Sequence, residues 1–318
     1  MNRHQQGYTL VELMISMLLG LMLISGFGSL FVQSQKNSTT QRSLSYMMED
    51  GRYVLEVFGK ELRRAGFLKN KLNISGGGGA NDVFAADANV LGSTMSFSAG
   101  EYIKGEYNAA GFGAAADLPY NINRLTLRYQ LNNSIDPITG KSAELASGDP
   151  SSTNSACEGN VLLTPGEDTA TNQIHVVTLL FYVAFDVTTN APVLYCLAKR
   201  QNLTDSTKDK TPPAVKAQPL ISNVQKLVIT YGIDNDPTND LIDGGRAANY
   251  YVTADSVTNW QQVVAAKLSV VLRSEDDNLT QNVVNYTIDG DPNSPYTATD
   301  KRLYRVSSST IAFRNKIL

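Results

Sequence analysis

The chain has little of what most catalytic and metal-binding sites are built from. Its 318 residues include two cysteines, Cys157 and Cys196, two histidines, His4 and His175, and one tryptophan. No His-Glu-x-x-His pattern, nucleophile elbow or Cys/His pair of useful spacing occurs. Lys and Arg are scattered and the net charge is −3, so the basic stripe of a nucleic-acid-binding protein is missing. We therefore expect neither catalysis nor nucleic-acid binding.

Charge is absent from Leu13 to Val32, a run of 20 residues. As a helix this run is about 30 Å long, which matches the hydrocarbon core of a bilayer. A cleavable secretory signal would have a shorter apolar region and a small-residue cleavage site. The sequence therefore predicts a membrane-spanning helix that stays in the protein.

One carboxylate, Glu12, precedes this run, where insertion scales give a cost of roughly 2.5–3.5 kcal/mol for such a charge. Cutting the chain after Gly7 would give Tyr8 a new α-amino group, four residues before Glu12. The ammonium and the carboxylate would then lie at the same end of one helix. In the uncut chain Glu12 has no obvious partner, so the acid predicts a processing site at Gly7.

The stretch GYTLVEL, residues 7–13, resembles the prepilin processing motif of type IV pilins and type II secretion pseudopilins. The resemblance implies that a membrane peptidase cuts after Gly7 and that the new amine of Tyr8 is N-methylated. The family usually has Phe where this chain has Tyr8. Glu12 is fifth in the mature chain, and by resemblance it pairs with the amine of an adjacent subunit during assembly.

The helix is expected to continue beyond the membrane, because no proline occurs in residues 8–66. At 1.5 Å per residue this gives a single helix of about 85–90 Å. Apolar or small residues recur at spacings of four and three: Leu44, Met48, Gly51, Leu55, Phe58, Leu62 and Ala65. Charged residues lie off this stripe, at Arg52, Glu56, Lys60, Glu61 and Arg63. The second half of the helix is therefore predicted to be amphipathic and to support a globular domain.

Alternation of apolar and polar residues predicts strands over 124–131, 225–233 and 266–273. The more uniformly apolar stretch 175–187 is predicted to be a central strand, paired as a hairpin with 193–200. A period of two is typical of antiparallel sheets with one covered and one wet face. Together these elements predict an α+β fold, with a long N-terminal helix packed on an antiparallel β-sheet domain.

Four further stretches resemble the PilW family of minor pilins, in the family's order. They are residues 51–67, 221–234, 260–274 and 300–315. The resemblance implies a leader peptide over residues 1–7, a transmembrane and filament-core helix over 8–32, an amphipathic helix over 33–67 and a β-rich head over 68–318.

By the same resemblance the chain is a structural minor pilin that primes type IV pilus assembly and sits in the tip complex. The implied partners are a prepilin peptidase, other minor pilins, the major pilin, the inner-membrane assembly platform and a tip adhesin. Before assembly it would span the inner membrane once with a periplasmic head, and afterwards it would lie on the pilus at the cell surface. Cell adhesion and twitching motility are the processes such pili serve.

Two alternatives stay open. One is a minor pseudopilin of a type II secretion system, similar to GspJ. The other is a signal-anchored periplasmic binding protein or enzyme whose leader matches the motif by accident; it would keep residues 1–7 in the mature chain.

Cys157 and Cys196 are predicted to form a disulfide, because the domain that follows the anchor is expected to lie outside the cytoplasm. A bridge across this separation would stabilise the fold by about 4 kcal/mol on the loop-entropy model. The alternative is two buried free thiols.

An acidic stretch over residues 234–243 contains Asp234, Asp236, Asp240 and Asp243. Closely spaced Asp and Asn oxygens are the ligands that calcium prefers. The Gly and the final bidentate Glu of the known calcium loop are missing here. The stretch is therefore a candidate calcium site, with a solvated turn as the favoured interpretation, and no other cofactor is expected.

Overall fold

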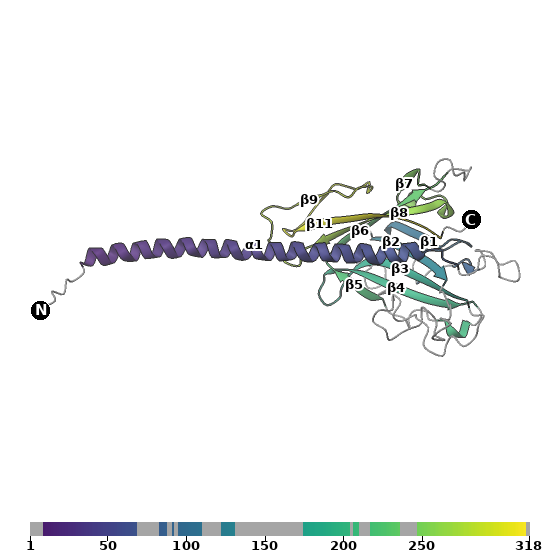
Figure 1. The fold of residues 1–318 in the computed structure, drawn as a ribbon, viewed down its shortest axis with the longest axis horizontal. Coiled ribbons are helices and arrows are strands. Elements are labelled where there is room, and N and C mark those ends of the chain that lie inside the picture. Colours follow the sequence, from purple (N-terminus) through teal and green to yellow (C-terminus); the bar gives the residue numbers. More distant parts are fainter. Residues whose placement is uncertain are drawn as a thin grey trace, which may run out of the picture.

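A computed structural model describes residues 9–68, 83–87, 91, 95–109, 122–130, 174–203, 206–209, 217–235 and 247–315. One long helix, α1 (Leu10–Arg64), leads into a head made of strands (Figure 1). The strands are β1 (Ile103–Ala109), β2 (Ile122–Gln130), β3 (His175–Phe185), β4 (Pro192–Asn202), β5 (Gln218–Ser222), β6 (Val224–Ile233), β7 (Tyr250–Val252), β8 (Val263–Arg273), β9 (Asn285–Tyr286), β10 (Tyr296–Thr297) and β11 (Tyr304–Ala312). Short 3-10 helices are η3 (Ser206–Lys208), η4 (Ala254–Ser256) and η5 (Trp260–Gln262).

The ends of α1 follow from local chemistry. The Thr9 hydroxyl caps the N-terminus by accepting a hydrogen bond from the backbone N–H of Glu12 at 3.3 Å. At the other end Gly66 has a φ of +73°, a conformation that favours glycine, and its N–H donates to the Arg128 carbonyl at 2.9 Å. The prediction of one unbroken helix is confirmed over Leu10–Arg64.

The strands form two main antiparallel sheets, where the sequence predicted one. A five-stranded sheet has the order β1-β2-β3-β4-β5, and a four-stranded sheet has the order β11-β8-β6-β7. β9 and β10 form a small hairpin of their own. In the view of Figure 1, β3, β4 and β5 lie below the second half of α1, and β7, β8 and β11 lie above it. The main core lies between the helix and the inner faces of both sheets.

The predicted strands occur where alternation placed them. β6 and β8 contain the predicted stretches 225–233 and 266–273, and β2 contains residues 124–130 of the third, whose last residue lies outside the described residues. β3 and β4 form the predicted hairpin, with Phe181 opposite Cys196 in its register. Each pairing in the two main sheets is antiparallel. The α+β class, with one long apolar helix and antiparallel sheets, is therefore confirmed.

The buried stripe of α1 differs in part from the predicted one. Phe58, Leu62 and Ala65 are buried as expected, but Leu44 is 37% exposed and Met48 is 54% exposed. Glu61 was placed on the solvent face and is instead fully buried.

The reason for this shift is the direction from which the head meets the helix. Met47 and Val54 are buried in place of Leu44 and Met48. Between them Gly51 lies against Ser307 of β11, so the helix is covered on the side of Met47 and Gly51. Sequence spacing alone does not reveal that side.

The prediction of a wet sheet face is wrong for the five-stranded sheet. Thr126 and Arg128 of β2 are 0% and 2% exposed, although they alternate with the core residues. Arg128 donates to the Ala85 carbonyl at 2.8 Å and stacks on the rings of Phe84 and Phe97. Burial lowers the pKa of Arg128 to about 10, against the opposing charges of Asp87 and Glu101. Residues 83–87 and 95–97 thus cover the face that was expected to be wet.

Candidate assembly site

The first half of α1 presents apolar side chains to solvent on all sides. From Leu10 to Val32 the large apolar residues are 55% to 77% exposed. By length and composition this is the one described helix apolar enough to cross a membrane, and none of its most apolar window is buried within the molecule. An apolar surface of this size requires a bilayer or other helices around it.

Glu12 is the only charged residue described in this half before Lys36. It lies in the first turn of α1, where a carboxylate interacts favourably with the helix dipole, and it is exposed. Ser16 donates to its backbone carbonyl at 2.8 Å. No ion pair joins the Glu12 side chain to any residue in the described part of the chain.

The predicted processing residues, Gly7 and Tyr8, lie outside the described residues. Cleavage after Gly7, methylation of Tyr8 and the assembly role of Glu12 therefore stay predictions. The structure places Glu12 in the first turn of α1, three residues after the capping residue Thr9.

The predicted calcium ligands are only partly described. Asp234 follows β6, and its N–H donates to the Gln262 carbonyl at 2.9 Å. Asp236, Asp240 and Asp243 lie outside the described residues. No group of three potential metal ligands occurs among the residues that are described. The calcium site stays a hypothesis.

Cys196 lies in β4, is 1% exposed and is disulfide-bonded. Cys157 lies outside the described residues, so the predicted pairing of the two cysteines stays a prediction.

A polar cluster around Asp291 was not predicted from the sequence. The Asp291 carboxylate is buried and accepts hydrogen bonds from the hydroxyls of Tyr107, at 2.7 Å, and Tyr296, at 2.6 Å. Asn293 donates its side-chain amide to the Tyr107 hydroxyl at 2.7 Å, and Lys226 donates to the Tyr296 hydroxyl at 2.5 Å. We call these five residues the Asp291 cluster.

The Asp291 cluster fastens the β9–β10 hairpin to both sheets, because Tyr107 belongs to β1 and Lys226 to β6. Beside it the rings of Tyr286, Tyr296 and Tyr304 stack at centroid distances of 5.2 and 5.6 Å. They cover Val228 and Val271 on the outer face of the four-stranded sheet. The acidic, Pro-rich stretch 289–295 reads as a plain turn in the sequence, since its partner Tyr107 is 184 positions away.

Comparison with known families gives two matches. Residues 180–315 match the family of the type IV pilus-assembly protein W, PilW. Residues 2–28 match the prokaryotic N-terminal methylation motif. No curated protein and no solved structure matches the chain.

The PilW match includes three of the four stretches in which the sequence resembled that family, and it runs from β3 to the end of β11. The methylation motif covers most of the apolar half of α1 that the molecule leaves exposed, up to Gly28, together with Glu12. The chain therefore carries, over residues 180–315, the PilW domain of type IV pilus-assembly proteins and, over residues 2–28, the prokaryotic N-terminal methylation motif.

Proposed function

We propose that the chain is a minor pilin that is cut after Gly7, methylated at Tyr8 and assembled into a type IV pilus. In this proposal the leader consists of residues 1–7 and the head of residues 68–318. The helix over residues 8–32 holds the subunit first in the membrane and then in the filament core. The amphipathic helix over residues 33–67 joins this helix to the head. The subunit helps to prime assembly and sits in the tip complex, with other minor pilins, the major pilin, the assembly platform and an adhesin as partners.

The observation that carries the proposal is the apolar surface of Leu10–Val32, exposed on every side, with Glu12 in its first turn. Such a helix leaves the bilayer only for another apolar environment, and parallel helices of the same kind supply one. In that dry interior a carboxylate requires a positive partner, and the α-amino group of a neighbouring mature chain fits this need. The pairing would set how the helices are staggered along the filament.

The head supports an end position. It is built from two sheets and an additional hairpin, which is more than an amphipathic helix requires for its cover. Gold labelling of an epitope tag in the head would test the location: the proposal expects label at filament ends, and label along the whole shaft would contradict it.

A pseudopilus subunit of type II secretion would use the same helix. The PilW match over residues 180–315 favours the pilus. Finding the chain in sheared pilus preparations supports the pilus, whereas loss of protein secretion with normal pili in a deletion strain would support the pseudopilus.

A substitution at Glu12 tests the assembly step. Glu12→Gln removes the charge and keeps the shape of the side chain, so the protein should insert into the membrane as before. Its amount in pili should fall at least about tenfold, which corresponds to losing about 1.4 kcal/mol or more of interaction with the neighbouring subunit. The measurement is the ratio of protein in sheared pili to protein in membranes. Glu49→Gln is the matched control, because Glu49 is an exposed carboxylate on the same helix beyond the membrane half. Equal incorporation of the Glu12 variant and the control would overturn the assembly role.

A further inference from the structure

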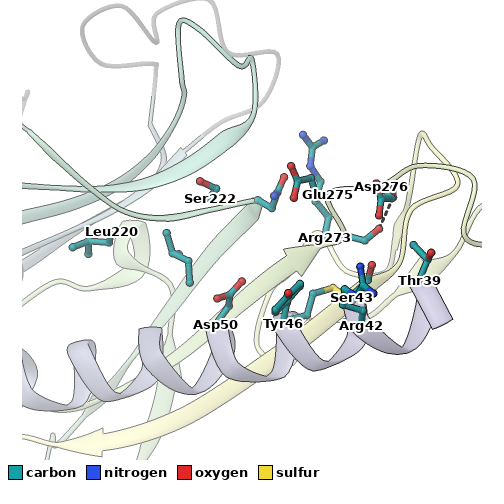
Figure 2. A pocket seen from close by; sticks show the side chains of 14 residues that line it. Thr39, Arg42, Ser43, Tyr46, Asp50, Leu220, Ser222, Arg273, Glu275 and Asp276 are labelled. Carbon is teal, nitrogen blue, oxygen red and sulfur yellow. Dashed lines mark hydrogen bonds between the residues drawn. The ribbon is translucent and has the colours of Figure 1, made fainter.

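A groove opens where the head meets α1 (Figure 2). It lies toward the membrane half of the helix, because its α1 residues run from Thr39 to Asp50. Its volume is about 620 Å³, within the range of protein ligand sites. One wall consists of residues 220–223, the end of β5 and the residue that follows it, and another of residues 273–276, which begin at the last residue of β8. The third wall is a stripe of α1 formed by Thr39, Arg42, Ser43, Tyr46, Met47 and Asp50. We call this site the basal groove.

The charges in the basal groove are mostly unpaired. Neither Asp50, Glu275 nor Asp276 forms an ion pair with any residue that the structure describes, and Arg42 forms none either. Arg273 is 4.0 Å from Asp300, outside the groove. Burial and the neighbouring charge of Glu49 raise the pKa of Asp50, so this carboxylate lacks compensation within the molecule. Three unpaired carboxylates against one unpaired guanidinium favour a cationic ligand.

Two buried polar groups in the groove also lack hydrogen-bond partners among the described residues. Ser43 is 9% exposed and its hydroxyl makes no hydrogen bond to a described residue, whereas the hydroxyl of Ser45 on the same helix donates to the Gln41 carbonyl at 3.0 Å. The Nε of Arg273 is buried without a partner. A ligand with acceptor atoms would give both donors a hydrogen-bond partner.

These requirements together describe a peptide segment that carries Lys or Arg. Its backbone carbonyls would accept hydrogen bonds from Ser43 and Arg273. Its ammonium or guanidinium group would lie between Asp50 and Glu275. The aliphatic stem of a long basic side chain matches the apolar floor of the groove, to which Met47 contributes with 3% exposure.

A lipid headgroup fits this site less well. Thr39 lies seven residues beyond Val32, about 10 Å further along the helix, and Asp50 lies about 27 Å further. The headgroup layer extends only about 5–8 Å beyond the hydrocarbon core. Most of the groove is therefore out of reach of the bilayer surface, and its carboxylates would repel phosphate groups.

We propose that the basal groove binds a basic segment, bearing Lys or Arg, of a neighbouring subunit in the pilus. In a filament of parallel helices, this end of the head is the one that each subunit turns toward the next subunit on the membrane side. The inference rests on the proposed function and adds to it the surface that this chain uses and the chemistry of its partner.

Photo-crosslinking in cells that assemble pili tests the proposal. A benzoylphenylalanine replaces Tyr46, which lines the groove and is 60% exposed. The control replaces Tyr53, which is 41% exposed on the same helix but outside the groove. The proposal expects a stronger adduct at Tyr46, joined to a peptide of another pilus subunit that contains Lys or Arg. An adduct with phospholipid, an adduct with a segment lacking basic residues, or a yield no higher than at Tyr53 would overturn it.

A second measurement distinguishes the loss of binding in the groove from a general loss of folding. Asp50→Asn combined with Glu275→Gln should lower the Tyr46 adduct about fivefold, the change expected for losing about 1 kcal/mol of ion pairing. Glu56→Gln combined with Asp255→Asn removes two exposed carboxylates outside the groove and should leave the yield unchanged. An equal loss in both pairs would contradict the proposal. The N-terminus of the same sample is also sequenced. A mature chain that forms no adduct would refute only the proposed ligand of the basal groove. A chain that is still uncut would refute the proposed function.

Discussion

At the residue scale, Asp291 shows how one buried carboxylate can hold distant segments together. Burial alone would raise the pKa of Asp291, but hydrogen bonds from Tyr296, Tyr107 and the N–H of Asn293, with the nearby charge of Lys226, outweigh it, and the pKa lies below its usual value. A lowered carboxyl pKa stabilises the folded state above the unfolded pKa of about 3.9. That stabilisation is lost as the pH falls through the folded pKa.

Asp291→Asn is therefore predicted to destabilise the head at neutral pH by about 1–3 kcal/mol, because tyrosine hydroxyls lose a charged acceptor. The melting temperature of the full chain in detergent, recorded by circular dichroism at pH 7, measures the loss. Below about pH 4 the difference between wild type and variant should shrink, since the wild-type carboxylate becomes protonated there. A difference that stays constant from pH 7 to pH 2 would show that Asp291 does not act through its charge.

At the element scale, the second half of α1 and the two sheets depend on close contacts between named residues. Phe58 is fully buried, and its ring centroid lies 4.6 Å from that of Phe181 in β3. Gly105 of β1 gives room to Tyr231 of β6, whose ring carbon Cζ would be 2.7 Å from an added Cβ. The first contact joins helix and sheet, and the second joins the two sheets.

Phe58→Ala tests the contact between helix and sheet. Phe to Ala changes in a core cost about 3–5 kcal/mol, so the unfolding midpoint of the head in denaturant should fall markedly. Tyr53→Ala is the matched control on the exposed side of the same helix and should change stability by about 0.5 kcal/mol or less. Similar losses for both variants would contradict the packing described here.

Gly105→Ala tests the contact between the sheets. The added methyl group would overlap the Tyr231 hydroxyl, and relieving such crowding typically costs about 1–3 kcal/mol. A combined Gly105→Ala and Tyr231→Phe variant should recover part of the loss, as measured by the same unfolding midpoints. No loss in the single variant would show that the sheets can move apart freely.

The sequence predicted the positions of helices and strands better than it predicted which of their faces are buried. Periodicity depends on each segment alone, which is why the span of α1 and strands β2, β6 and β8 were predictable. Covering of a face depends on distant segments: Arg128 is buried by Phe84 and Phe97, and no local pattern reveals this. The same holds for Ser43 and Asp50, which line a groove only because residues from β5 and β8 reach α1.

At the scale of the whole molecule, the chain divides into an apolar rod and a packed head along one continuous helix (Figure 1). The rod is stable in water only with a cover, and the head has its own core. Under the proposed function, this division would let one chain insert in a membrane and later join a filament without refolding. The proposed pairing of Glu12 requires that the chain be cut after Gly7.

The most direct test is the mass-spectrometric sequence of the N-terminus of protein purified from membranes of cells with an active prepilin peptidase. The account predicts a mature chain that begins with N-methylated Tyr8, four residues before Glu12. A chain that still begins at Met1 would contradict processing, leave Glu12 without its partner and return the protein to the class of ordinary membrane-anchored proteins.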